Sequence, residues 1–170
     1  MAVNVFWKFN APDVVGSSLM KGQEGKQEII SYSHAFEQLT NPVRSAAGGG
    51  TIERAHHGTF NMTQELDEAF IPMLKLLWSG KHIEKGTLMC YRSAGDTGGE
   101  QMGVPYLKLE LEAIVITHLD ISGGPGELPT VNFALNYAKC TYTYTPVDHS
   151  KGTAAAAIPV SHDLRTNVVA

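Results

Sequence analysis

Two adjacent histidines near a glutamate come closest, in this chain, to a reactive arrangement. His56 and His57 follow Glu53 in the segment TNPVRSAAGGGTIERAHHG, residues 40–58. Imidazole nitrogens bind metals and transfer protons near neutral pH, and a carboxylate orients them for either task. Adjacent residues of an extended chain point to opposite sides, however, and no helical i, i+4 histidine pair with a glutamate is present. We therefore interpret both histidines as part of a solvated or interfacial loop, without a metal or catalytic role.

Other motifs that could carry chemistry are incomplete. Ser79-Gly80-Lys81-His82 lacks the spacing of a phosphate-binding loop, and its glycine closes a helix, where the negative end of the dipole repels phosphate. The glycine-rich stretches 93–103 and 122–126 lack the G-x-G-x-x-G pattern between a strand and a helix. No G-x-S-x-G elbow occurs either. The sequence therefore predicts a protein that is not an enzyme and needs no cofactor.

The composition of the chain fits one folded domain over residues 1–170. Hydrophobic residues make up 43% and charged residues 18%, as in ordinary globular proteins. The net charge of −4 argues against nucleic-acid binding, which usually needs an excess of Lys and Arg. The sequence has neither a secretory signal pattern nor an apolar run near the roughly 20 residues of a membrane span. We expect a protein made in the cytosol that binds no nucleic acid and inserts into no membrane.

Strand patterns dominate the sequence. The alternation of Val3, Val5, Trp7 and Phe9 predicts a strand over 3–9, and similar patterns occupy 27–39, 86–92, 105–118 and 130–145. A short segment over 158–169 could return as a last strand. Turns of hairpin length, such as 122–129, join most of these segments. About seven to nine strands with a single helix are typical of an antiparallel barrel or sandwich.

The segment TVNFALNYAKCTYTYTP, residues 130–146, changes its bulky face midway. Large side chains occupy odd positions up to Tyr137 and even positions from Cys140 onward. We interpret the segment as one strand that is covered on both sides, by different things at its two ends, and the second cover could be another copy of the chain. Cys140 and Cys90 both lie in strand patterns, and we expect both thiols to be buried and reduced.

One helix is predicted over about 67–79, where apolar residues recur at spacings of three and four. Pro72 fits its first turn, and Gly80 follows its end. The earlier segment 40–58 contains three consecutive glycines at 48–50, which favour a free backbone. We predict a long extended loop there, of a length that usually has a function.

An ordered set of short motifs runs over most of the chain. They are Met1-Ala2-Val3 with Phe6 and Lys8, EIISYS at 28–33, Ser79-Gly80-Lys81-His82 after the helix, RSAG at 92–95, YLKLEL at 106–111, SGG at 122–124, the segment 130–146 with Asn132, Phe133, Tyr137, Tyr142 and Tyr144, and Asp163-Leu164-Arg165-Thr166-Asn167. In this order they resemble the haemolysin co-regulated protein (Hcp) family, which forms the tube of the bacterial type VI secretion system. The chain departs from the family pattern at Phe70-Ile71, where relatives often carry Ser or Thr before the proline, and in its longer, glycine-rich stretch 96–104.

The resemblance implies an antiparallel β-barrel of two sheets with one flanking α-helix, assembling with itself into a homohexameric ring. Rings would stack inside a contractile sheath built on a baseplate, with a spike protein at the tip and secreted effectors in the lumen. Such a protein is cytoplasmic when made and is then secreted without a signal peptide. In a ring of this kind the loop 40–58 would act as a subunit-contact arm. Its candidate contact residues are Asn41, Arg44, Gly48, Gly49, Gly50, Thr51, Glu53, Arg54, His56 and His57.

Two other functions remain open from the residues alone. A monomeric barrel could hold a small ligand in an internal cavity, and the size of the native particle would distinguish it from a ring. An enzyme would need an activity that is lost on mutation of His56 or His57. The sequence does not identify the effectors or the target cells.

Overall fold

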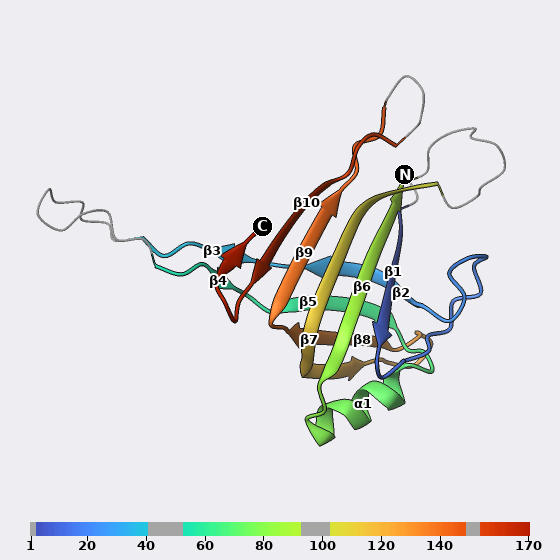
Figure 1. Cartoon of the computed structure of the whole chain (residues 1–170). Coiled ribbons are helices and arrows are strands. Elements are labelled where there is room, and N and C mark those ends of the chain that lie inside the picture. Colours follow the sequence, from blue (N-terminus) through green and yellow to red (C-terminus); the bar gives the residue numbers. More distant parts are fainter. Residues whose placement is uncertain (1–2, 41–52, 93–102, 149–153) are drawn as a thin grey trace, which may run out of the picture.

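The computed structural model describes residues 3–40, 53–92, 103–148 and 154–170 (Figure 1). Within these ranges one helix accompanies the strands, so the prediction of a mainly β fold is confirmed. No helix in the described ranges is long and apolar enough to cross a bilayer. The elements are β1 (Val3–Asn10), β2 (Gln27–Ser33), β3 (Phe36–Glu37), β4 (His56–His57), β5 (Phe60–Glu65), α1 (Phe70–Ser79), β6 (Ile83–Arg92), β7 (Val104–Ser122), β8 (Thr130–Asn136), β9 (Lys139–Tyr144), β10 (Ile158–Asp163) and β11 (Val168–Val169).

Six of the strands close into an antiparallel barrel. They are hydrogen-bonded in the order β7-β6-β1-β2-β5-β8, and β8 returns to β7, while β9, β10 and β11 extend the sheet beyond β7. Closure is possible because β7 changes partners along its length. Residues 104–114 pair with β6 and 115–122 pair with β8. Ala113 lies at this change with a φ of 53°, a value uncommon for residues that carry a Cβ.

The barrel walls form two layers that cross each other (Figure 1). We call β1, β6, the first part of β7, β9, β10 and β11 the front sheet. The rear sheet consists of β2, β5, β8 and the second part of β7, and runs across behind it. Helix α1 lies at the lower end of the barrel in Figure 1, and its Met73 and Leu76 are buried.

Aromatic side chains fill the space between the two sheets. Trp7 is fully buried, with its ring 5.2 Å from that of Phe9 and 5.8 Å from that of Phe60. Gly86 of β6 leaves room for the indole, because a Cβ at this position would lie 2.3 Å from the Trp7 ring. Phe133 of β8 is also buried. The interior of the barrel is therefore a packed core.

The helix confirms both of its predicted boundary residues but begins later than predicted. It starts at Phe70, because the Asp67 carboxylate accepts a hydrogen bond from the Ala69 N–H at 3.1 Å and holds the preceding residues in a turn. Pro72 lies in the first turn, where a missing N–H has no consequence. Gly80 adopts the left-handed conformation, with a φ of 61°, and ends the helix.

The interpretation of residues 130–146 as one strand is wrong. The segment breaks at Tyr137-Ala138 into β8, which lies in the rear sheet, and β9, which lies in the front sheet. The Ala138 N–H donates to the Glu112 carbonyl at 3.0 Å at this corner. Phe133 before the corner and Cys140 after it therefore face the same core. The change of bulky face is caused by the change of sheet, and a second copy is not needed to explain it.

Other strand predictions are confirmed with corrected limits. The segment 27–39 contains two strands, β2 and β3, and the expected last strand is present as β10 with β11. The expected burial of Cys90 and Cys140 is also confirmed, and the two thiols are not joined to each other. Burial raises the pKa of both, that of Cys140 to about 12.

Candidate assembly surfaces

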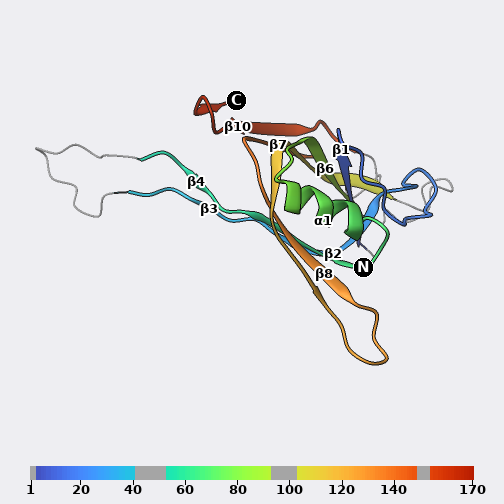
Figure 2. The same cartoon turned by 90° about the horizontal axis from the view of Figure 1, so that it is seen from below.

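Part of the predicted loop 40–58 is a two-stranded hairpin that projects from the barrel (Figures 1 and 2). Phe36 pairs with His57 and Glu37 pairs with His56. We call the described parts of this projection, residues 35–40 and 53–58, the arm. The Glu53 N–H donates to the Leu39 carbonyl at 3.3 Å, so main-chain contacts continue beyond the two short strands.

The arm exposes apolar side chains outside the barrel core. About half of the surface of Phe36 and of Leu39 is accessible. Of the predicted contact residues, Glu53, Arg54 and His56 are exposed on the arm and His57 lies at its base; the remaining ones, Asn41, Arg44, Gly48, Gly49, Gly50 and Thr51, lie outside the described residues. Apolar groups on a projecting segment are typical of a contact with another molecule.

A chain of hydrogen bonds between histidines and tyrosines holds the base of the arm. Nδ1 and Nε2 of His34 lie 2.7 Å from the Tyr142 hydroxyl and 2.6 Å from the Tyr137 hydroxyl, respectively. Nδ1 of His57 lies 2.8 Å from the same Tyr137 hydroxyl, and its Nε2 lies 2.9 Å from Nδ1 of His162. We call His34, Tyr137, Tyr142, His57, His162 and the terminal Asn167 the His–Tyr chain. His57, interpreted from the sequence as part of a solvated or interfacial loop, is half-buried in β4 and has two hydrogen-bond partners.

Burial keeps His34, His57 and the two tyrosines of this chain neutral near pH 7. Burial, together with the neighbouring His57, lowers the pKa of His34 to about 4. Burial also lowers the pKa of His57, with His162, His56 and Arg54 adding to the effect. The pKa values of Tyr137 and Tyr142 are raised by burial. Among the residues that the structure describes, no three His, Cys, Asp or Glu side chains are placed to hold a metal ion.

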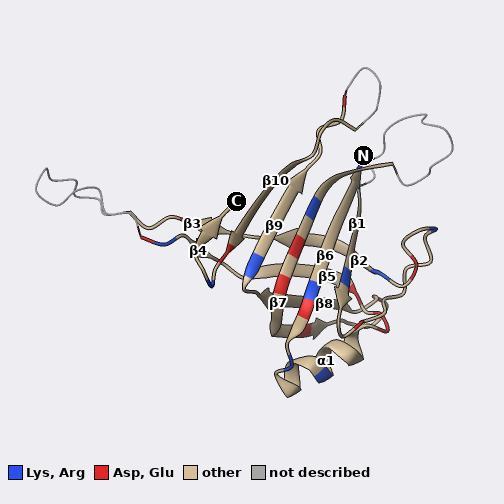
Figure 3. Ribbon diagram, viewed as in Figure 1, with Lys and Arg blue, Asp and Glu red and all other residues tan. Residues whose placement is uncertain are grey.

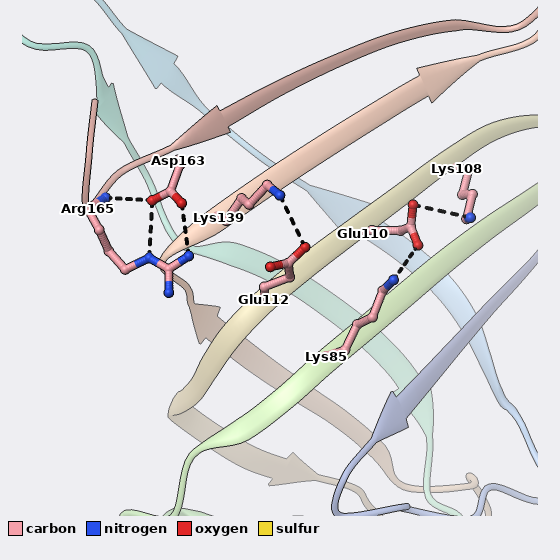
Figure 4. A network of polar contacts seen from close by, with 7 residues as sticks. All are labelled: Lys85, Lys108, Glu110, Glu112, Lys139, Asp163 and Arg165. Atoms are coloured by element: carbon pink, nitrogen blue, oxygen red, sulfur yellow. Dashed lines mark hydrogen bonds and ion pairs between the residues drawn. The ribbon is translucent and has the colours of Figure 1, made fainter. Parts of the chain in front are cut away.

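The outer face of the front sheet carries charges of alternating sign (Figures 3 and 4). Glu110 of β7 accepts from Lys85 at 2.8 Å and from Lys108 at 3.2 Å. Further along the same face, Glu112 lies 3.5 Å from Lys139 of β9. Exposed ion pairs of this kind contribute little to stability. Their main effect is to leave this face with nearly balanced charge.

The outer face of the rear sheet carries many uncharged polar side chains, together with the carboxylates of Glu65 and Asp120. The Thr63 hydroxyl of β5 donates to the Asn132 side-chain oxygen of β8 at 2.7 Å. The hydroxyls of Ser122 and Thr130 lie 3.1 Å apart at the end of β7 and β8. The family-motif residue Asn132 is therefore an outer-face residue, whereas Phe133 beside it belongs to the core.

Two edges of the rear sheet carry no further strand in the described residues. The paired residues of β1 and β2 are Phe6 with Glu28 and Trp7 with Gln27, which leaves the end of β2 open on that side. Residues 115–122 of β7 pair with β8 on one side, and no other described strand borders them. Unpaired strand edges offer N–H and C=O groups to a further strand. The rear sheet can therefore be extended in both directions.

The remaining family-motif residues lie at the end of the helix and at the end of β9. The Ser79 hydroxyl donates to the Leu76 carbonyl at 3.2 Å, and Lys81 and His82 are exposed after the helix. Tyr144 is half-exposed at the end of β9. Sequence reasoning missed His34 and His162, because they lie more than 100 residues from the partners that they meet on β9 and β4, respectively. No local pattern indicates such a pairing.

Comparison with solved structures finds the same fold in secretion proteins. Hcp1 from Salmonella typhimurium is 19% identical, with a TM-score of 0.77 and complete coverage of both chains. A chain described as a type six secretion system protein is also 19% identical, with a TM-score of 0.86 over 99% of this chain and 100% of that one. A chain of the anti-feeding prophage baseplate, described as 6-fold symmetrised, is 11% identical, with a TM-score of 0.50 over 82% and 91%. Comparison with curated protein sequences gives no match.

The family comparison covers most of the barrel. A family model described as "Type VI secretion system effector, Hcp" matches residues 6–144. This span runs from β1 to the end of β9 and includes the arm and the helix. The matched span leaves out β10 and β11, so His162 and Asn167 of the His–Tyr chain lie beyond it. With this coverage, the chain belongs to the Hcp family of type VI secretion system proteins.

Proposed function

We propose that this protein is a tube subunit of the type VI secretion system. Six copies form a ring, and rings stack into the inner tube that a contractile sheath drives into a target cell. The observation that carries the proposal is the arm, which projects from the barrel of an Hcp-family chain and exposes apolar side chains. The tube bears a spike protein at its tip, assembles on a baseplate and can carry secreted effectors in its lumen.

The open edges of the rear sheet support the ring. A ring built by head-to-tail contacts needs two different surfaces on each copy. The end of β2 and residues 115–122 of β7 provide two strand edges on opposite sides of one sheet. The fold is shared with a chain from a baseplate described as 6-fold symmetrised, which is the symmetry that the proposal needs.

The arm supports contacts between neighbouring copies. An element with little core of its own, but with Phe36 and Leu39 exposed, gains buried apolar area when it packs on a second copy. The subunit-contact role extends to the predicted residues from Asn41 to His57. The work of such a tube is mechanical, so the proposal includes no active site and no cofactor. The subunit is a single domain that is secreted after synthesis in the cytoplasm.

Native mass spectrometry and negative-stain microscopy of the purified protein test the proposal together. We expect a particle of six subunits and a ring with an open centre. A matched variant carries Leu39→Ser, which removes exposed apolar surface from the arm and leaves the barrel core unchanged. We expect a smaller fraction of rings for this variant at equal protein concentration. A wild-type protein that remains monomeric at micromolar concentration would contradict the proposal.

The packed interior of the barrel does not support the alternative function, a monomeric barrel that binds a small ligand. Trp7, Phe9, Phe60 and Phe133 fill the space that a ligand would need. A hollow of about 360 Å³ lies on the surface instead, lined by residues of β1, β2 and the segments 17–20 and 65–67. The particle size measured above also distinguishes the two functions, since a ligand-binding barrel would be a monomer.

A further inference from the structure

The His–Tyr chain has one hydrogen-bond direction when all of its histidines are neutral. At its far end, Nε2 of His162 lies 3.1 Å from the Asn167 side-chain oxygen, which can only accept, so this nitrogen carries the proton. Nδ1 of His162 must then accept from Nε2–H of His57. Asn167 has a φ of 55°, a left-handed value that asparagine tolerates, and this turn places its side chain against His162.

The same reasoning continues to the other end of the chain. Nδ1 of His57 has no proton left, so it accepts from the Tyr137 hydroxyl. The Tyr137 oxygen in turn accepts from Nε2–H of His34, and Nδ1 of His34 accepts from the Tyr142 hydroxyl. Every donor along the chain therefore meets an acceptor. All three histidines carry their proton on Nε2.

The hydrogen-bond pattern of the His–Tyr chain can accommodate one additional proton but not a second one. If His162 becomes protonated, the bonds between it and Tyr142 can all reverse, and only the Tyr142 hydroxyl proton then needs an acceptor outside the chain. A second proton, on His57 or His34, would place two N–H groups against each other or leave a hydroxyl proton without an acceptor. It would also place two positive charges in neighbouring rings, and the ring centroids of His57 and His162 are 4.9 Å apart.

The charged groups around the chain do not relieve this conflict. Arg54 and His56 lie near His57 on the arm and disfavour its protonation. Asp163 follows His162, but its carboxylate is engaged by the Arg165 guanidinium at 2.9 and 3.1 Å. The thiol of Cys140 lies next to Tyr137. This thiol is neutral, because burial raises its pKa to about 12.

The chain links the arm base to the corner before β9 and to β10, which is itself paired with β9 along its whole length. His34 and His57 belong to the arm base, Tyr137 to the corner before β9, and His162 to β10. We propose that the His–Tyr chain is an acid-sensitive latch, which fastens the arm to this corner and to β10 at neutral pH and releases it in acid. The latch acts within one subunit and does not depend on the proposed ring.

The direction of the pH effect follows from the neutral state of the histidines. The pKa of His34 is about 4 in the closed latch, against an ordinary value of 6.5. The contribution of this histidine to latch stability is therefore complete above pH 6.5 and is lost as the pH falls toward 4. Over this window the opening equilibrium rises by about tenfold per pH unit for one proton taken up on opening.

Hydrogen exchange followed by mass spectrometry on the full chain tests the latch between pH 7.5 and 4.5. After correction for intrinsic exchange, we expect exchange in the arm base to accelerate by about tenfold per pH unit below 6.5. Exchange in β6, within the barrel, should not accelerate. Equal pH dependence of both regions, or none in the arm base, would overturn the proposal. Mass photometry of the same samples reports ring dissociation separately.

Two variants and one spectrum complete the experiment. His57→Gln removes the central imidazole, and we expect the acid acceleration to fall to less than about threefold per pH unit. His82→Gln is the matched control, since His82 is exposed after the helix and lies outside the chain, and it should behave as wild type. An unchanged slope in His57→Gln would overturn the latch. If that variant does not fold, ¹⁵N-histidine NMR of the wild type at pH 7.5 decides: three Nε2–H tautomers are expected, and an Nδ1–H tautomer at His34, His57 or His162 would overturn the proposal.

Discussion

The barrel and the arm are stabilised by different kinds of interaction. In the barrel, buried aromatic and aliphatic side chains surround Trp7, and neighbouring strands are paired along most of their length. The arm has two short strands, exposed Phe36 and Leu39, and a polar chain at its base. The difference indicates that residues which stabilise the fold are largely separate from those available for assembly. Substitutions can therefore be chosen that lower the stability of the fold and leave assembly unchanged, or that weaken assembly and leave the stability of the fold unchanged.

The largest loss of stability is expected from Trp7→Ala in the barrel. The substitution leaves a cavity in the centre of the core, and such truncations cost about 3–5 kcal/mol. Chemical denaturation measures the change in the free energy of unfolding. Ile71→Ala is the control, because Ile71 is exposed on the helix and its truncation should cost less than about 0.5 kcal/mol. Similar losses for both variants would contradict the placement of the core.

A smaller loss is expected from Cys140→Ser and Cys90→Ser. Each replaces a buried sulfur by a more strongly polar hydroxyl at the longer distance set by the thiol, where Cys90 Sγ lies 3.6 Å from the Tyr32 hydroxyl, at a cost of about 1–3 kcal/mol. Because burial raises the pKa of Cys140 to about 12, its thiolate is scarce at pH 8 and labelling in the native protein should be slow. Rapid labelling of both thiols, or an intramolecular disulfide on a non-reducing gel, would contradict this prediction.

Tyr137→Phe tests the boundary between the two regions. It removes the hydroxyl that His34 and His57 share, and we expect a loss of about 1–2 kcal/mol in the free energy of unfolding. The phenyl ring still fills the core, so the barrel should keep its thermal cooperativity. Tyr144→Phe on the half-exposed end of β9 serves as the control and should cost less. Equal losses of unfolding free energy in the two variants would show that the Tyr137 hydroxyl contributes no more to stability than the hydroxyl of a half-exposed tyrosine.

The smallest loss of stability, with a clear loss of assembly, is expected from deletion of Gly48 to Gly50. These residues belong to a glycine-rich segment that should contribute little to the barrel core, whereas the arm needs its reach. The ring fraction from native mass spectrometry and the thermal midpoint are compared for the same variant. The comparison between barrel and arm would fail if the deletion lowered both equally or lowered the midpoint alone.

The sequence predicted the strands and the helix boundaries that are determined by neighbouring residues in the chain. The alternation from Val3 to Phe9 gave β1, since one face of a strand recurs every second residue. Pro72 and Gly80 marked the first turn and the end of α1, because each restricts or permits particular backbone angles wherever it stands. The family motifs, spread in order over the chain, predicted the family that the comparison with residues 6–144 confirmed.

The tertiary structure decided what depends on distant residues. The change of face at Tyr137-Ala138 has the same sequence pattern whether one strand is covered twice or two strands meet at a corner, and the pairing of β8 and β9 with different sheets settles it. His34, His57 and His162 carry no mutual spacing, so their contact arises when barrel closure brings β10 beside the base of the arm. Periodicity reports which side of a strand is buried, but the partner on that side is set by the path of the whole chain.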